Sequence, residues 1–139
     1  MRITLDNPAT VPAPVGPFAH VARVDLGAGA LLLLAGQIAV DDSGDLVAPG
    51  DMTAQAERVF DLISSILAAH GGTLADVLHI RTFLTDLADL PAYGAVRRRL
   101  FPTDPPASTT VEVSALFRPG AVLEVEVTAA VPGTSFMVI

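Results

Sequence analysis

Apolar residues recur along the chain with two different periods, and the longer period predicts two helices. The first helix begins after Asp51, which can cap a helix N-terminus, and ends at Gly71-Gly72. Its apolar residues recur at helical spacing and are Val59, Leu62, Ile63, Ile66 and Leu67. The second helix begins after Asp89 and is closed by Pro102. Its apolar stripe consists of Leu90, Tyr93, Val96, Leu100 and Phe101.

Extended apolar segments surround the helices and predict strands. They cover residues 19–26, 31–40, 77–84, 108–115 and 122–131. Gly27 and Gly29 indicate a hairpin between the first two, and the prolines of residues 7–17 predict an extended lead-in. The element order is ββαβαββ. Because no repeat or linker interrupts it, we expect one α+β domain over residues 1–139, with a mixed sheet of about six strands and two helices on one face.

The predicted sheet has more apolar surface than two helices can cover. In the last strand, Leu123 and Val125 share one face, whereas Glu124 and Glu126 share the other. The aliphatic run 31–34 has no polar face, which is typical of a strand buried on both sides. Two helices can cover only one face of such a sheet. We therefore hypothesise that the other face is buried against further copies of the chain.

Composition excludes several classes of function. The chain is 51% hydrophobic with a net charge of −7, which argues against disorder and against binding to nucleic-acid phosphates or anionic membranes. All eight basic residues are Arg, which excludes lysine nucleophiles, and the absence of Cys excludes thiol catalysis. No signal peptide is visible, and the longest aliphatic run is far shorter than the ~20 residues of a membrane-spanning helix. We expect a soluble, cytoplasmic protein with no nucleic-acid or membrane partner.

The histidines and the basic cluster have structural interpretations. His20, His70 and His79 lack metal-ligand spacing and no nucleotide-binding motif is present, so we expect no metal and no cofactor. An imidazole at His70 commonly caps helix carbonyls, while His20 and His79 are interpreted as packed or surface residues. The cluster 97–99 falls in the last turn of the second helix, where cations oppose the macrodipole. A solvated helix end is therefore favoured over an RNA site.

Two carboxylates remain as candidates for chemistry. Glu124 and Glu126 lie on the same face of an otherwise apolar strand. Either both are solvated charges on an exposed face, or one is a general acid/base held near a cleft. The pattern alone does not decide between these interpretations.

Several short motifs occur in order along the chain. They are Gly16-Pro17-Phe18, Ala35-Gly36-Gln37-Ile38, Gln55 in the first helix, Pro106-Ala107-Ser108-Thr109-Thr110-Val111 and Leu123-Glu124-Val125-Glu126. This set resembles the RidA family, also called YjgF or L-PSP, whose members have GPY, SGQ, PARST and EIE at these places. The resemblance extends from about Pro14 to Val131 and includes the element order.

The resemblance implies a chorismate-mutase-like fold and a homotrimer whose sheets pack into a central barrel, with the helices outside. Such a trimer would cover the free sheet face. The resemblance also implies clefts between neighbouring subunits, where small carboxylate-bearing metabolites bind. Members closest to the family's type hydrolyse enamines and imines to 2-oxo acids and ammonia without a cofactor.

Two of the residues that the resemblance assigns to the cleft are retained. Glu124 matches the glutamate that orders the attacking water, and Gly36 keeps the glycine of the SGQ motif. Glu124 is therefore the predicted catalytic residue.

The other matched positions have lost polar groups. Ser108 replaces the arginine that clamps the substrate carboxylate, and a hydroxyl supplies neither its charge nor its bidentate geometry. Phe18 replaces a tyrosine, Ala35 replaces a serine, and Gly94 stands at the place of an asparagine. Arg118, in a nearby loop, is the candidate to replace the lost cation, although loop arginines are usually solvated. The chain resembles an Arg-lacking branch of the family.

Three functions follow as hypotheses. The first is an enamine/imine deaminase-like hydrolase that uses Glu124 on a non-standard substrate. The second is a non-catalytic trimer that binds a metabolite or a partner protein. The third, an endoribonuclease or translation inhibitor, is disfavoured by the charge of −7 and the lack of Lys. The apolar C-terminal segment 135–139 either packs on a neighbouring subunit or is frayed.

Overall fold

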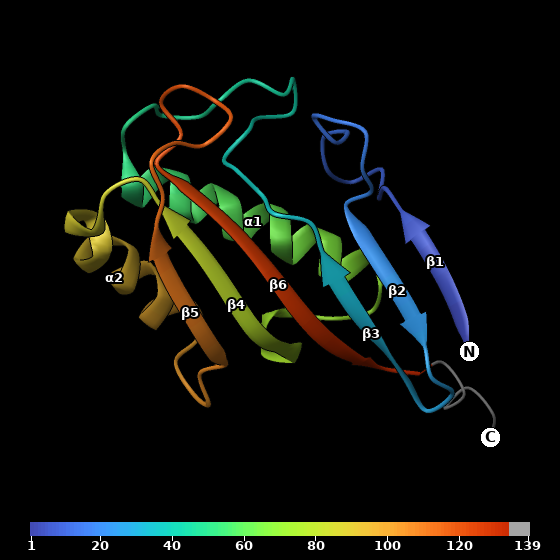
Figure 1. Cartoon of the computed structure of the whole chain (residues 1–139). Coiled ribbons are helices and arrows are strands. Elements are labelled where there is room, and N and C mark those ends of the chain that lie inside the picture. The colour runs from blue at the N-terminus through green and yellow to red at the C-terminus, as the bar shows by residue number, and fades with distance from the viewer. Residues whose placement is uncertain (134–139) are drawn as a thin grey trace.

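The computed structural model describes residues 1–133, so the segment 135–139 lies outside the described residues. Within them the chain forms one six-stranded sheet and two α-helices (Figure 1). The strands are β1 (Arg2–Asp6), β2 (Val21–Asp25), β3 (Gly29–Leu34), β4 (Val77–Leu84), β5 (Ala107–Glu112) and β6 (Leu123–Pro132). The helices are α1 (Met52–Ala69) and α2 (Leu90–Leu100), with 3₁₀ turns at η1 (Leu74–Asp76) and η2 (Leu87–Asp89).

The sheet is mixed, with the strand order β1-β2-β3-β6-β4-β5. All neighbouring strands are antiparallel except β4 and β5, which are parallel because α2 crosses between them. The predicted hairpin is confirmed between β2 and β3, where Gly27 has a φ of +90°. β4 has the bounds predicted from its apolar pattern. β3 ends earlier than predicted, because between Leu34 and Val40 the chain makes only two isolated bridges, from Gln37 to Val125 and from Val40 to Leu46.

The first strand was missed by the sequence analysis, which placed no element before residue 19. Residues 2–6 alternate polar and apolar and pair with β2, with Ile3 opposite Val24 and Leu5 opposite Ala22. Both apolar side chains are largely exposed, so this edge strand adds little to the core. Its pairing is carried by backbone hydrogen bonds.

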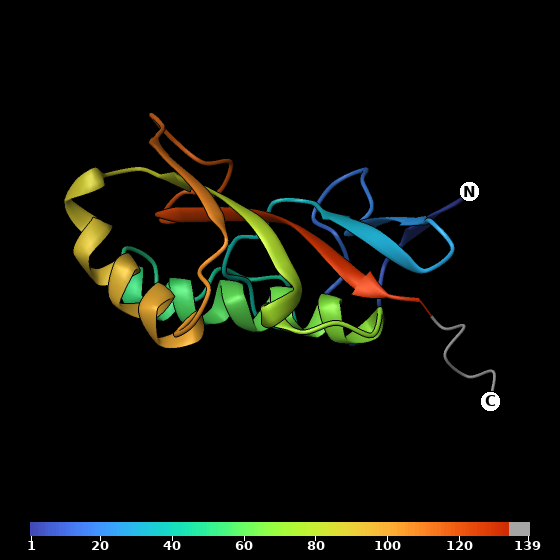
Figure 2. The same cartoon turned by 90° about the horizontal axis from the view of Figure 1, so that it is seen from below.

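Both helices pack on the same face of the sheet, as predicted (Figure 2). The core between them includes Phe60 and Ile63 of α1 and Leu123 and Val125 of β6, all at most 1% exposed. Burying apolar area of this kind is the main stabilising contribution in a domain of this size. No helix in residues 1–133 is long and apolar enough to cross a membrane.

Of the three residues predicted to cap a helix, Asp51 does so, whereas the side chains of Asp89 and His70 do not. Asp51 caps α1, since its Oδ1 accepts a hydrogen bond of 3.1 Å from the Ala54 amide. Asp89 occupies the N-cap position of α2 but its side chain makes no capping bond, because Asp86 already caps the preceding 3₁₀ turn. At the end of α1, the His70 imidazole bonds Asp6 instead of capping helix carbonyls.

The second face of the sheet carries no helix. Leu31 and Leu33 of β3 lie on it and continue the apolar stripe of Ile3 and Leu5 through cross-strand neighbours. Leu33 is 46% exposed and Leu5 70% exposed. The prediction that two helices leave one face uncovered is therefore confirmed for a single chain. This face also carries the two candidate carboxylates.

Candidate functional site

Glu124 lies on the open face of β6 and is seated against the backbone of Gly36. The bridge between Gln37 and Val125 brings residues 35–37 alongside β6, where Gln37 and Val125 exchange two backbone hydrogen bonds of 2.8 and 3.1 Å. A Cβ built at residue 36 would overlap Oε1 of Glu124 and lie 2.9 Å from its Cδ. A glycine at this position leaves room for Glu124 in the conformation it has here, and a larger residue would displace its carboxylate.

The two glutamates of β6 have different electrostatic surroundings. In the strand register Glu126 lies opposite Arg81, whose Nε donates to its Oε1, whereas Glu124 lies opposite Phe83. Burial raises the pKa of the Glu124 carboxyl above its ordinary value, and the charge of Glu126 raises it further. The protonated form of Glu124 is therefore favoured relative to that of an exposed glutamate, which is the property that acid/base chemistry requires of a carboxyl group.

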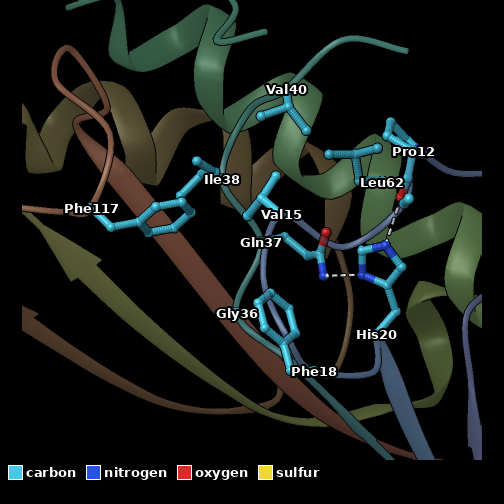
Figure 3. Close-up of a pocket in the computed structure, with 11 residues that line it drawn as sticks. Pro12, Val15, Phe18, His20, Gly36, Gln37, Ile38, Val40, Leu62 and Phe117 are labelled. Atoms are coloured by element: carbon cyan, nitrogen blue, oxygen red, sulfur yellow. Dashed lines mark hydrogen bonds between the residues drawn. The ribbon is translucent and has the colours of Figure 1, made fainter. Parts of the chain in front are cut away.

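A small pocket lies under Gly36 and is walled by Phe18, Phe117 and Leu62 (Figure 3). Its volume is about 20 Å³, which is room for about one water molecule, and it opens to solvent. Phe18 and Gly36, two of the predicted cleft residues, therefore line one cavity. Phe117, from the loop between β5 and β6, was not among the predicted residues.

His20 and Gln37 hold this part of the chain in place. The buried His20 ring approaches the carbonyl of Pro12 at 2.7 Å through Nε2 and the Gln37 side-chain amide at 3.2 Å through Nδ1 (Figure 3). Gln37 Nε2 can only donate, so His20 Nδ1 is the acceptor of that hydrogen bond. The ring proton of His20 is therefore on its Nε2, which donates a hydrogen bond to the Pro12 carbonyl. Gln37 Nε2 also donates to the carbonyl of Ala35. The packed role predicted for His20 is confirmed, and its effect is to fix the backbone that precedes Gly36.

A second group of predicted residues lies on the helix-covered face. Ser108 of β5 is in register with the buried Ile80, and its Oγ accepts a hydrogen bond of 3.3 Å from Nη1 of Arg97. Gly94 lies one turn before Arg97 on α2. Gly94 and Arg97 line an open cavity of about 500 Å³. In a single chain this group and Glu124 lie on opposite faces of the sheet.

The arginine cluster differs from its prediction at one residue. Arg98 and Arg99 are exposed, as expected for a solvated helix end, and Arg99 pairs with Glu57 at 2.9 Å. Arg97 is half-buried and folds back over Tyr93 and Phe101. The solvated interpretation is therefore wrong for Arg97. Arg118 makes no side-chain hydrogen bond within residues 1–133, and its proposed role stays a prediction.

Among residues 1–133, no cluster of three or more His, Asp or Glu side chains could hold a metal ion. The groups that the structure brings together at Gly36 are the Glu124 carboxyl and the backbone beside it. These groups can order a water molecule and transfer protons.

Comparison with known proteins agrees with the motifs. The endoribonuclease L-PSP family model matches residues 9–131. Protein DfrA of Myxococcus xanthus is 40% identical over 83% of this chain and 86% of its own. The 3-aminoacrylate deaminase RutC of Acinetobacter baylyi is 34% identical over 85% of this chain and 90% of its own. The crystal structure of RidA from an Antarctic Psychrobacter species superimposes with a TM-score of 0.76, at 33% identity, covering 86% and 92% of the two chains.

The chain belongs to the RidA family. Its six-stranded mixed sheet with two helices is the fold of its structural relatives in that family. Within this RidA fold, the retained Glu124 and Gly36 are in direct contact, so the two motifs that contain them meet at one place in the structure. The sequence motifs could not show that the glycine is required by the glutamate.

Proposed function

We propose that this RidA-family protein hydrolyses enamine- or imine-type metabolites, with Glu124 as the catalytic acid/base. The proposal rests on the surroundings of Glu124. Its carboxyl group has a raised pKa, lies against Gly36 and has no ion-pair partner among residues 1–133. The RutC relative is a deaminase of a small enamine acid, which supports the same class of reaction.

The chemistry needs only water and one proton carrier. The carboxylate of Glu124 takes a proton from water as the oxygen attacks the carbon of the protonated imine, which gives a carbinolamine. The protonated carboxyl then gives that proton to the amine nitrogen. The C–N bond breaks as the hydroxyl proton passes to the carboxylate, the carbonyl compound leaves, and ammonia takes the proton from the carboxyl and leaves as ammonium. For an enamine, the protonated carboxyl first delivers a proton to the β-carbon. A raised pKa keeps a fraction of Glu124 protonated at higher pH for that step.

We propose further that the site is completed between subunits of a homotrimer. Ser108 and Gly94 lie on one side of the sheet and Glu124 on the other, so one chain cannot present both groups to one ligand. Packing the open face against a second copy would cover Leu31 and Leu33 and bring a neighbour's edge to Glu124. Sedimentation at micromolar concentration measures this directly. A monomer would contradict the shared cleft.

The activity is tested by coupling an amino-acid oxidase to the protein, with imines generated from a panel of amino acids. We expect release of the 2-oxo acid to accelerate with the wild-type protein and not with Glu124→Gln. Glu57→Gln is the matched control, since Glu57 is a surface carboxylate paired with Arg99. Equal rates for Glu124→Gln and the wild type would contradict the assignment of Glu124.

A non-catalytic binding protein is the second candidate, and the loss of polar groups at Phe18, Ala35 and Ser108 favours it. In that case a ligand would raise the melting temperature without any product being formed. Product formation that requires Glu124 would exclude this alternative.

A further inference from the structure

Arg97 occupies the space beside the position where the family's clamping arginine is replaced by Ser108. Its Nη1 donates to Ser108 Oγ at 3.3 Å and to the Tyr93 hydroxyl at 3.2 Å. The guanidinium carbon lies 5.6 Å from the centre of the Tyr93 ring and 5.7 Å from that of Phe101. The Tyr93 hydroxyl is held in turn by Thr82 at 2.5 Å. The guanidinium is therefore fixed by hydroxyls and aromatic rings.

Within the described residues, no carboxylate neutralises this cation. Among residues 1–133 Arg97 belongs to no ion pair, although the chain carries a net charge of −7. Its Nε is buried and has no hydrogen-bond partner among those residues, so nothing in residues 1–133 compensates the charge. The side chain as a whole is only partly buried. An external anion that reaches its exposed part would therefore supply the missing opposite charge.

The residues that line the cavity around Arg97 indicate the chemistry of the rest of such a ligand. It is lined by two arginines and by no acidic residue. The remaining walls are mostly apolar or aromatic and comprise Leu90, Tyr93, Gly94, Phe101, Pro102, Pro105 and Thr110. A planar guanidinium at one end of an apolar cavity fits a carboxylate carried on an apolar body.

We propose that Arg97 is the anion-binding residue of this site and that its ligand is a carboxylate with an apolar substituent. The inference rests on the proposed function in taking this cavity as part of the substrate cleft. Arg97 supplies from α2 the charge that position 108 lacks. The serine is then required, because an arginine at position 108 would place a second guanidinium against the first. Arg118 is not needed for this role.

The test compares two ligands that differ only in charge, phenylacetate and phenylacetamide, by calorimetric titration of the full-length protein. We expect the wild type to bind phenylacetate more tightly than the amide. Arg97→Gln should weaken phenylacetate binding by about 30-fold or more, the loss typical of removing one partner of a desolvated charge pair. Arg99→Gln is the control, since it removes the same charge from the same helical turn outside the cavity. Thermal unfolding verifies that both variants are folded.

A charge-swap variant separates a binding role from a packing role. In the double variant Arg97→Gln with Ser108→Arg, the guanidinium is supplied by position 108 on β5 instead of position 97 on α2. Restored phenylacetate binding supports one shared anion subsite, and unrestored binding contradicts it. Equal binding of acid and amide by the wild type, or unchanged binding by Arg97→Gln, would overturn the proposal. Glu124→Gln should still bind phenylacetate, so a failure of the catalytic proposal leaves a different pattern of results.

Discussion

Gly36→Ala is the substitution that tests most directly whether the Glu124 carboxylate does the chemistry. The added methyl would overlap Oε1 of Glu124 and lie 2.9 Å from Cδ and 3.0 Å from Cγ. Carbon atoms in contact prefer separations of about 3.5–4.0 Å. The backbone of Gly36 is held by its neighbour Gln37, which exchanges two hydrogen bonds with Val125. The carboxylate is therefore the part that moves, by at least about 1 Å.

The expected result is a large loss of activity with a small loss of stability. A displacement of about 1 Å at a catalytic group can cost about 100-fold in rate, and we expect kcat/KM to fall by that order. The clash is with the end of a flexible side chain, so the free energy of unfolding should change by less than about 1 kcal/mol. The displaced carboxyl also becomes better solvated, so its pKa should move down toward the ordinary value.

The assay is the oxidase-coupled release of 2-oxo acid, with carbon-13 NMR of Glu124 to follow the pKa. The control is the double variant Gly36→Ala with Glu124→Gln, whose rate should equal that of Glu124→Gln alone, since the methyl acts only through the carboxylate. A Gly36→Ala variant with full activity and an unchanged Glu124 pKa would refute the reasoning. Additive losses in the double variant would show that Gly36 acts by another route.

Two further predictions concern stability. Gln55 is fully buried; its Oε1 accepts a hydrogen bond from the Val122 amide, and its Nε2 donates to the carbonyls of Ala48 and Gly120. Gln55→Leu leaves the Val122 amide without a partner. The free energy of unfolding should therefore fall by about 1–3 kcal/mol, which lowers Tm by roughly 4–12 °C. Equal Tm values for Gln55→Leu and the wild type at the same protein concentration would contradict this. The raised pKa of Glu124 means that the folded state binds the proton more tightly, so wild-type stability should fall as the pH rises from 4.5 through the raised pKa. Thermal unfolding across that window should show a shallower decline for Glu124→Gln, and parallel curves would contradict the prediction.

The sequence predicted those parts of the fold in which a single periodicity dominates. α1 and β4 are strongly patterned and were placed correctly, because their apolar residues face one core. β1 was missed because its side chains are mostly exposed and its pairing comes from the backbone, for which apolar spacing gives no signal. Asp89 stands at the predicted N-cap position of α2 but makes no capping bond, because it is also the last residue of a 3₁₀ turn, capped by Asp86, that apolar spacing does not predict.

Glu124 and Gly36 were assigned to the cleft from two separate motifs, and their roles stay predictions. Their contact could not be predicted, because it depends on how residues 35–37 lie along β6. Arg97 was interpreted as a solvated helix end because its position in the last turn explains a cation equally well. Only the packing of α2 against β5 shows that its side chain turns inward.

The contact between Arg97 and Ser108 changes what the loss of the motif arginine means. When Ser108 alone is compared with the motif arginine, the cleft lacks that positive charge, and a substrate without a carboxylate is expected. In the fold, a guanidinium from a residue 11 positions earlier in the chain meets Ser108 at 3.3 Å, so the charge has moved from strand to helix. Recognition of a carboxylate depends on where the guanidinium nitrogens lie and not on which backbone carries them. The departure at position 108 therefore does not exclude carboxylate substrates, and the apolar walls of the Arg97 cavity point to larger ones.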